Sequence, residues 1–408
     1  MTLSAWRTPT VILVCGCLVA LISFGPRSTF GFFLPPMTAA NGWGRDTFAL
    51  ALAIEMLLWG AGQPFAGALA DRFGATWVLV GGALLYIVGI VWMAYAKSPL
   101  EFHLAAGVLI GLGLGGCSFG IVVGAFAKLL PPSWRTVSFG MGTAAGSFGQ
   151  FLFAPLGVAL IDLAGWQNAL LIFGGILLIV LPLCLPLGAP PRAPGAPPSA
   201  AVGQSIAEAL AEAFGHRSYV LLVLGYFTCG FQLFFITVHL PAYLVDRGLP
   251  AAIGGWTIAV IGLFNIFGSV ASGYISNLMP KRYLLSAIYF SRSLAIMAFI
   301  LLPPSPVVTL IFGAFIGILW LSTIPPTSAL VAIMFGPRWL TMLLGIAFFS
   351  HQVGGFLGVW LGGVLFESTG SYDVIWWCTI FFGVASAIIN LPIVEKPVPR
   401  RMPTASAV

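Results

Sequence analysis

Twelve long apolar segments constrain this chain more than any other feature of its sequence. A helix needs about 20 mostly apolar residues to cross the hydrocarbon core of a bilayer. Only 7% of the residues are charged, whereas a soluble domain carries about a quarter. The pattern predicts an all-α membrane protein with twelve transmembrane helices. The apolar runs lie near 10–36, 46–70, 75–96, 99–127, 135–161, 166–187, 217–244, 250–276, 282–302, 305–334, 339–366 and 372–394.

Cysteine usage and charge argue against several other classes of protein. The six cysteines are scattered, mostly inside apolar runs, and form no CxxC motif or Cys/His cluster. The sequence therefore indicates neither a disulfide framework nor a metal site. The net charge of +6 comes from dispersed basic residues, and we expect no nucleic-acid partner. We find no nucleophile–base pair and no cofactor motif, which argues against an enzyme and predicts no cofactor.

The distribution of basic residues predicts the orientation in the membrane. An even number of spans places both termini on one side. We interpret the first apolar run as a membrane helix, not a cleaved signal peptide, because it lacks a small-residue cleavage site in a polar setting. The loops on the terminus side hold twelve Lys and Arg residues, and the opposite loops hold only Arg45, Lys97 and Arg247. Because basic loops stay in the cytoplasm, we expect a multi-pass protein of a bacterial-type inner membrane with both termini cytoplasmic.

The two halves of the chain resemble each other in sequence. Displacing the sequence by 205 or 206 positions aligns similar segments at three places. A Pro- and Gly-rich stretch that ends as a short amphipathic helix lies between the halves, as a linker would. We predict an N-terminal six-helix half at 1–187, a cytoplasmic linker at 188–216, a C-terminal six-helix half at 217–394 and a tail at 395–408. The aligned pairs are Phe32–Met37 with Val238–Tyr243, Gly67–Gly74 with Gly273–Pro280, and Phe148–Gly157 with Val353–Gly362.

The loop between the second and third spans carries a recognisable motif. Its sequence "GALADRFG" resembles the Gly-x-x-x-Asp-Arg-x-Gly signature of the major facilitator superfamily. That resemblance implies two parallel six-helix repeats with a substrate site between them near the middle of the membrane. It also implies gating roles for four residues. Gly67 lets helices approach closely, Asp71 and Arg72 pair with a neighbouring helix end in one gate state, and Gly74 completes the motif.

Within that superfamily, the first span is similar to the monocarboxylate and oxalate/formate porter group. The sequence "GPRS", followed by two phenylalanines, matches a Pro-basic-Ser step before aromatic residues, and Gly42-Trp43 matches a "GW" before span two. The resemblance implies a carrier of small organic anions. One position differs. Many animal monocarboxylate carriers place a substrate-binding arginine in span eight, where this chain has Ser269, and the arginine here lies one span later at Arg292.

Two charged residues fall deep within neighbouring spans. Arg27 and Glu55 each lie about nine residues from the outer end of their span, which at 1.5 Å per residue is roughly 13 Å deep. Equal depth and opposite charge predict contact between them. An unpaired arginine at midspan costs at least ~2.5–3.5 kcal/mol, so a partner, a wet cavity or an anionic ligand must compensate. We interpret Arg27 as the carboxylate-binding residue and Glu55 as the proton-coupling residue; the alternative is a permanent ion pair that fixes helix packing.

Five further residues are secondary candidates for substrate contact. Arg292 reaches either the cavity or the carbonyls of a neighbouring helix. His239 and His351 relay protons or act as structural donors. Asn265 binds substrate or joins helices. Phe30 is one of many aromatic residues on the helices that line a cavity in this fold, and inward-facing rings would suit an organic body.

These observations predict a monomeric secondary transporter of a small organic anion, a monocarboxylate, driven by proton symport or exchange. Its partners are then a small organic substrate and the lipid bilayer. Two alternatives within transport remain, a carrier of a bulkier solute such as a riboflavin-like vitamin and an exporter of toxic compounds. A sensor that binds solute without moving it is the alternative from another class, and solute flux in proteoliposomes distinguishes it.

Overall fold

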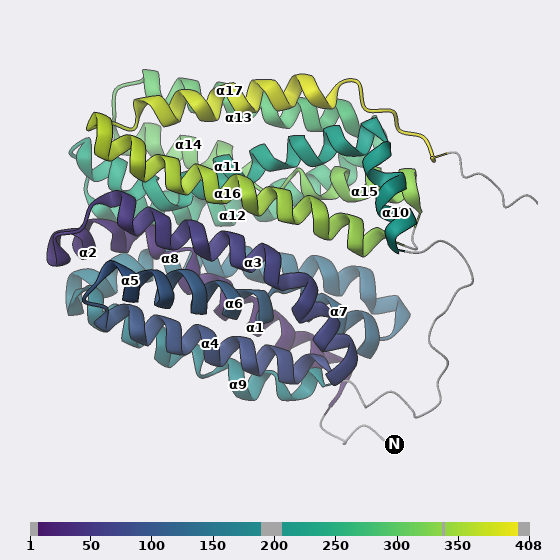
Figure 1. The fold of residues 1–408 in the computed structure, drawn as a ribbon, viewed down its shortest axis with the longest axis horizontal. Helices are drawn as coiled ribbons and strands as arrows, with labels where there is room; N and C mark the ends of the chain where they lie inside the picture. Colours follow the sequence, from purple (N-terminus) through teal and green to yellow (C-terminus); the bar gives the residue numbers. More distant parts are fainter. Residues whose placement is uncertain (1–6, 189–205, 337–338, 399–408) are drawn as a thin grey trace, which may run out of the picture.

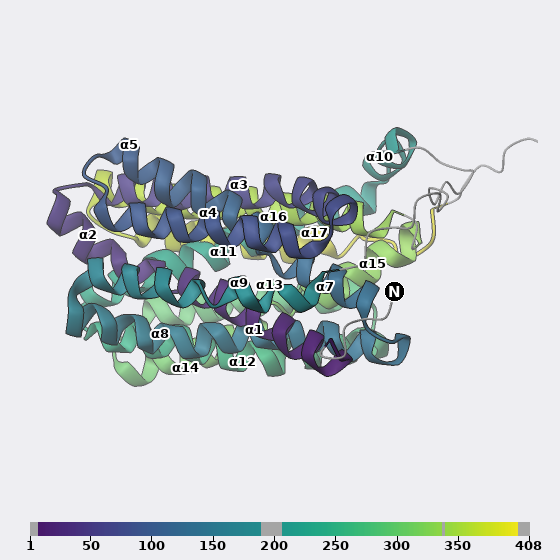
Figure 2. The ribbon, with the colours of Figure 1, turned by 90° about the horizontal axis from the view of Figure 1, so that it is seen from below.

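The structure is a computed structural model that describes residues 7–188, 206–336 and 339–398. The described chain is almost entirely helical and contains no strand. Two groups of long helices, one from each half of the chain, run side by side along the long axis (Figure 1, Figure 2). We call the end of the bundle that carries α2 and the loop before α3 the far end, and the end at which α1 begins the terminus end.

The first half begins with a broken span and continues through nearly continuous helices. Its elements are α1 (Pro9–Arg27), η1 (Phe30–Phe33), α2 (Leu34–Asn41), α3 (Arg45–Phe73), α4 (Ala75–Tyr95), α5 (Pro99–Phe102), η2 (His103–Leu109, a π-helix), α6 (Ile110–Gly116), α7 (Phe119–Leu129), α8 (Pro132–Leu177), α9 (Val180–Leu183) and η3 (Leu185–Leu187).

After residue 205 the described chain resumes with a short helix at the terminus end and continues into the second half. Its elements are α10 (Ile206–Gly215), α11 (Arg217–Asp246), α12 (Ala251–Leu278), α13 (Lys281–Leu301), α14 (Pro306–Leu319), α15 (Ile324–Phe335), α16 (Leu340–Thr369) and α17 (Asp373–Asn390). The described part of the predicted linker, from Ile206, is the amphipathic helix α10.

The described chain holds eleven helical segments that are long and apolar enough to cross a membrane. One of them, Ser138–Leu183, has 46 residues and contains two spans. Gly165 separates these two with a φ of 80°, a left-handed value that a residue without a Cβ adopts readily. The predicted twelve transmembrane helices are therefore confirmed, as is the break between 161 and 166.

Several predicted spans differ from single helices, among them 99–127, which is divided among α5, η2, α6 and α7. The span at 10–36 breaks after Arg27, where the hydroxyls of Ser28 and Thr29 donate to the carbonyls of Gly25 and Pro26. The span at 305–334 breaks between α14 and α15, just before two prolines. Proline interrupts a helix because it removes a backbone donor and clashes with the preceding turn. Since proline is itself apolar, the length of an apolar run does not reveal these breaks.

The internal repeat is visible in the helix boundaries. The helix α12 begins 206 positions after α3, and α13 begins and ends 206 positions after α4. This spacing equals the displacement that aligns the two half-sequences, so the duplicated sequence corresponds to duplicated structure.

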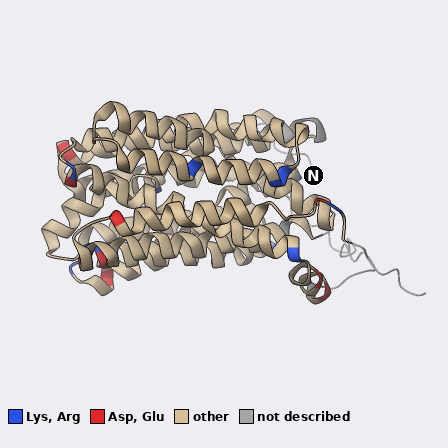
Figure 3. Ribbon diagram, turned by 90° about the horizontal axis from the view of Figure 1, so that it is seen from above, with Lys and Arg blue, Asp and Glu red and all other residues tan. Residues whose placement is uncertain are grey.

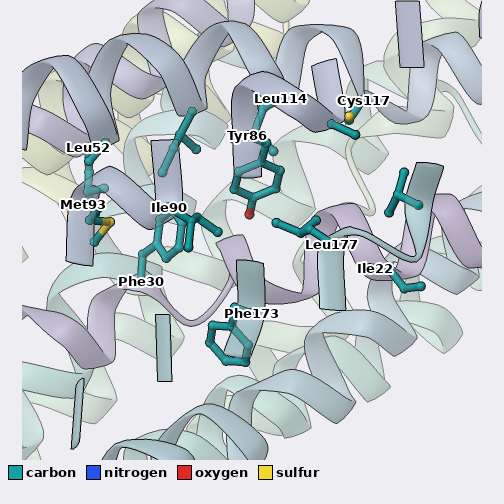
Figure 4. Close-up of a cluster of buried hydrophobic side chains, with 14 of the residues drawn as sticks. Ile22, Phe30, Leu52, Tyr86, Ile90, Met93, Leu114, Cys117, Phe173 and Leu177 are labelled. Carbon is teal, nitrogen blue, oxygen red and sulfur yellow. The ribbon is translucent and has the colours of Figure 1, made fainter. Parts of the chain in front are cut away.

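Each half has its own apolar core. One cluster of buried side chains comes mainly from the first half, and the other mainly from the second. Figure 4 shows part of the first cluster, in which Phe30, Tyr86 and Phe173 lie among aliphatic side chains. Charged residues gather at the two ends of the bundle, and its middle is nearly free of them (Figure 3). This is the distribution that a bilayer-spanning body requires.

The helices α11 and α16 pack closely because glycines lie between them. A Cβ at Gly354 of α16 would collide with the backbone oxygen of Phe227 on α11, and a Cβ at Gly230 of α11 would collide with that of His351. In contrast, a Cβ at Gly345, also on α16, meets no atom within 4 Å.

We therefore expect Gly354→Ala to destabilise the protein and Gly345→Ala to leave it unchanged or slightly more stable. Overpacking a tight contact costs about 1–3 kcal/mol, whereas replacing an unconstrained helical glycine by alanine gains up to about 1 kcal/mol. Thermal unfolding of both variants in the same detergent checks this. Equal unfolding temperatures for the two variants would contradict the packing argument.

Candidate functional site

The buried ion pair between Arg27 and Glu55 lies at the break in the first span. Arg27 is the last residue of α1, so the end of that helix directs its side chain toward α3. Its Nε donates to Glu55 Oε1 at 3.1 Å, and the two side chains are 2% and 0% exposed. The predicted contact between these residues is confirmed.

The guanidinium group of Arg27 has few strong acceptors. Besides Glu55, its Nη2 contacts the thioether sulfur of Met56 at 3.0 Å, which is a weak acceptor. Its central carbon lies 4.6 Å from the ring centroid of Phe234 and 5.9 Å from that of Trp59. Because Phe234 is on α11, the positive charge lies at the boundary between the two halves.

Aromatic rings extend from Arg27 to His351 across both halves. Trp59 lies 6.4 Å from Phe234 and 6.0 Å from Phe348, measured between ring centroids. The His351 ring stacks on Phe348 at 5.9 Å, with an angle of 12° between the planes, and lies 5.4 Å from Phe234. Tyr226, 5.1 Å from His351, completes the group. We call Arg27, Glu55, Trp59, Tyr226, Phe234, Phe348 and His351 the central cluster.

Three polar atoms of the central cluster are buried without a hydrogen-bond partner among the described residues: Glu55 Oε2, Trp59 Nε1 and His351 Nε2. The hydrogen bonds of His351 explain its state. Its Nδ1 lies 3.1 Å from Gln352 Oε1, which can only accept, while Gln352 Nε2 donates to the Met56 carbonyl. Nδ1 therefore carries the proton, and Nε2 of the neutral ring presents a lone pair. Unpaired buried polar atoms are rare in proteins, so three of them in one cluster of side chains call for an explanation.

Arg292 is buried elsewhere, against the break in span ten. Its Nε and Nη2 donate to the Leu319 carbonyl at 3.1 and 2.5 Å, and Nη2 also donates to the Trp320 carbonyl at 2.5 Å. Its Nη1 contacts Cys229 Sγ at 3.4 Å. These carbonyls have lost their helical partners because α14 ends there. Of the two alternatives for Arg292, the structure displays hydrogen bonding to a neighbouring helix.

His239 belongs to a polar network at the far end. Arg45 of α3 forms a bidentate ion pair with Asp246 of α11, at 2.5 and 2.8 Å. Arg45 also donates to the hydroxyl of Tyr372 at 3.0 Å, and that hydroxyl lies 3.2 Å from His239 Nδ1. Since His239 Nε2 donates to the Val359 carbonyl at 2.8 Å, the tyrosine donates to Nδ1. Burial raises the pKa of Tyr372 to about 12, so it remains a donor at neutral pH.

The far-end network joins the two halves, and the contact weakens toward the terminus end. The backbone amide of Arg45 donates to Glu367 Oε1 at 2.6 Å, and α3 and α16 stay in contact as far as Gly60 and Gln352. Two turns further toward the terminus end, Gly345 has open space at its Cβ position. The halves are therefore closed against each other at the far end.

The remaining predicted residues lie outside the central cluster. Asn265 donates to Ser147 Oγ at 2.8 Å and so joins α12 to α8 across the halves. Phe30 is 1% exposed within the core of the first half. Of the predicted gating residues, Gly67 meets no atom within 4 Å of a Cβ position, Arg72 lies over the ring of Phe73, and Gly74 ends α3 with a φ of 94°. The side chain of Asp71 lies outside the described residues.

The sequence predicts the contact between Arg27 and Glu55, but it does not place His351 near them. It also gives no prediction of the aromatic rings that lie between these residues. Trp59 was detectable, since it lies one helical turn from Glu55 on the same face of α3. Tyr226 and Gln352 carried no such signal. Arg45 counted only as a loop charge, and its pairing with Asp246 depends on how the halves meet.

Two duplicated six-helix halves with charged and polar side chains between them form the arrangement of a membrane transporter. The family model of the Major Facilitator Superfamily matches residues 16–359, and the chain belongs to this superfamily. It is therefore a multi-pass membrane transporter of a small molecule and not an enzyme.

Comparisons with individual proteins agree with the family. The uncharacterized MFS-type transporter YcxA of Bacillus subtilis is 28% identical over 91% of each chain. Monocarboxylate transporter 11 of Mus musculus is 25% identical over 97% of this chain and 88% of its own. Among solved structures, a bacterial homolog of the human lysosomal transporter Spinster, inward-facing and unoccupied, has a TM-score of 0.76 at 15% identity, covering 95% of this chain and 97% of its own. The D-xylose-proton symporter has a TM-score of 0.72 at 16% identity, covering 95% and 98%.

We expect Arg45→Gln to open the far end, because the substitution removes the ion pair with Asp246. A partly exposed pair contributes about 1 kcal/mol or less, which is a shift of up to roughly fivefold in population. Distances between spin labels at Ala40 and Ala251, in a cysteine-free background, measure the separation of the halves. Arg247→Gln is the control, and an unchanged distance distribution in Arg45→Gln would show that the pair does not hold the far end closed.

Proposed function

We propose that this protein is a monomeric, proton-coupled carrier of a small organic monocarboxylate. The single observation that supports this most is the set of contacts of Arg27. A buried guanidinium between the two halves has one carboxylate oxygen and one thioether as hydrogen-bond partners, and a substrate carboxylate would supply the strong acceptors that it lacks. The monocarboxylate transporters among the relatives support the same substrate class.

The proposed coupling depends on competition for Arg27. When a substrate carboxylate binds the guanidinium, Glu55 loses part of its stabilisation, and in a buried site the neutral, protonated acid becomes favoured. The proton then crosses with the substrate and leaves when Arg27 returns to Glu55. The unpartnered Glu55 Oε2 is the oxygen that would take up the proton.

The proposed membrane is a bacterial-type inner membrane with both termini in the cytoplasm, as the distribution of basic loop residues suggests. In that orientation the closed far end faces outward, and the described conformation is inward-facing. The similarity to a transporter solved in an inward-facing conformation supports this assignment. Transport would require the far-end network to open and the terminus ends of the halves to close.

We expect Arg27→Ala to reduce uptake of radiolabelled monocarboxylates into proteoliposomes at least about tenfold, because charge-assisted hydrogen bonds contribute about 1.5–3 kcal/mol. Arg27→Lys should retain part of the activity, since lysine keeps the positive charge but lacks the planar set of N–H donors that binds both oxygens of a carboxylate. The exposed Arg247→Gln variant is the control for charge, and thermal unfolding checks that each variant is folded. Normal uptake by folded Arg27→Ala would refute the proposed site.

We expect Glu55→Gln to separate substrate movement from proton movement. The amide still accepts a hydrogen bond from Arg27 but cannot bind or release a proton. Exchange of labelled for unlabelled monocarboxylate should persist, while acceleration of uptake by an inward proton gradient should be lost. Glu101→Gln, on the far-end helix α5, is the matched control. Full gradient-driven uptake by Glu55→Gln would exclude Glu55 as the proton carrier.

A further inference from the structure

We infer that the preferred substrates are monocarboxylates with a single aromatic or other planar unsaturated ring, in preference to saturated aliphatic acids of the same size. This inference rests on the proposed function and specifies its substrate class. Three observations in the central cluster carry it: the ring faces, the unpartnered polar atoms and the distance between the charged and aromatic ends.

The surroundings of the guanidinium group are aromatic and come from both halves. Trp59 is on α3, Phe234 on α11 and Phe348 on α16, and the ring contacts connect them into one group with His351. Trp59 and Phe348 are only half-buried, so their faces are not fully used by the protein. Aromatic pairs prefer offset or edge-to-face contact and gain more than their buried area provides. A substrate ring next to the bound carboxylate would make such contacts.

The unpartnered polar atoms suit a ring with polar edges. Trp59 Nε1 is a buried donor and His351 Nε2 is a buried acceptor, and neither has a partner among the described residues. An unsatisfied buried polar atom costs about 1–3 kcal/mol. A ring substituent or heteroatom could pair with them, whereas an unsubstituted hydrocarbon group, saturated or aromatic, would leave both without a conventional hydrogen-bond partner.

The spacing within the cluster fits a carboxylate with one attached ring. The guanidinium carbon of Arg27 lies 4.6 Å from the Phe234 centroid, which lies 5.4 Å from that of His351. The guanidinium carbon and the His351 ring are therefore separated by no more than the sum of these distances, 10.0 Å. A carboxylate with one attached ring can reach both.

Matched acids test the inference on the full-length protein in nanodiscs. Calorimetry would measure the affinities of benzoate and cyclohexanecarboxylate, which have similar size and charge but differ in aromaticity, and of uncharged benzamide. We expect benzoate to bind at least about fivefold more tightly than cyclohexanecarboxylate, and benzamide to bind much more weakly than benzoate. Equal affinity of the two acids would overturn the inference and leave the proposed function standing. Binding of neither acid would overturn the inference, and equal binding of benzamide and benzoate would overturn the proposed function as well.

A variant pair tests the placement of the ring. Phe348→Leu should reduce the ratio of the benzoate affinity to the cyclohexanecarboxylate affinity, because the substitution removes a ring face and keeps an apolar side chain. Phe382→Leu, which alters a ring packed on Phe231 at 4.8 Å and outside the central cluster, should keep the preference. An unchanged preference in Phe348→Leu would contradict the aromatic site.

Discussion

The burial of positive charge between two lobes of a membrane protein is the constraint on which the rest of this structure depends. A guanidinium group stays protonated and positively charged, because its pKa lies far above physiological pH. Arg27 must therefore be compensated wherever the helices place it. Glu55 provides one carboxylate oxygen at 3.1 Å, and the surrounding rings provide cation–π attraction. This compensation leaves most of the N–H donors of the guanidinium group without a strong acceptor.

The two buried arginines differ in how the free-energy cost of burying their charge is compensated. Arg292 donates to two carbonyls at the break of span ten, so fixed backbone dipoles compensate its charge. These carbonyls in turn obtain from Arg292 the hydrogen bonds that the helix no longer provides. Removing either partner would leave unsatisfied groups in a region without water. Arg27 instead contacts side chains, one ionised and the others weakly polar or aromatic. Side chains can rotate or change protonation during a transport cycle, whereas backbone carbonyls at a helix break cannot. This difference, more than burial, distinguishes a binding arginine from a structural one.

Much of the fold could be predicted from the sequence, because a bilayer restricts the possible structures so strongly. The twelve spans follow from apolar length, and the repeat follows from matched segments such as "FFLPPM" and "VHLPAY". The Arg27–Glu55 contact follows from equal depth and opposite charge in neighbouring spans. Rotation about the helix axis could not be predicted, because helices that are apolar on every side give no periodic signal. For this reason the sequence did not reveal that Phe30 faces the core of its half or that His239 belongs to the far-end network. The ring contacts among Trp59, Phe234 and His351 depend on how three separate helices meet.

The arrangement of the central cluster across the halves explains how a substrate could drive alternating access. A ligand shifts a conformational equilibrium only as far as its affinities for the two states differ. Arg27 and Glu55 belong to the first half and Phe234 and His351 to the second, so a ligand that contacts all four experiences any change in how the halves meet. The far-end closure opposes such a change with one partly exposed ion pair and a few hydrogen bonds, two of which involve a charged group. Contacts of this kind contribute at most about 3 kcal/mol each, so the closed state is held by energies that ligand binding can match, and a reversible cycle needs that balance.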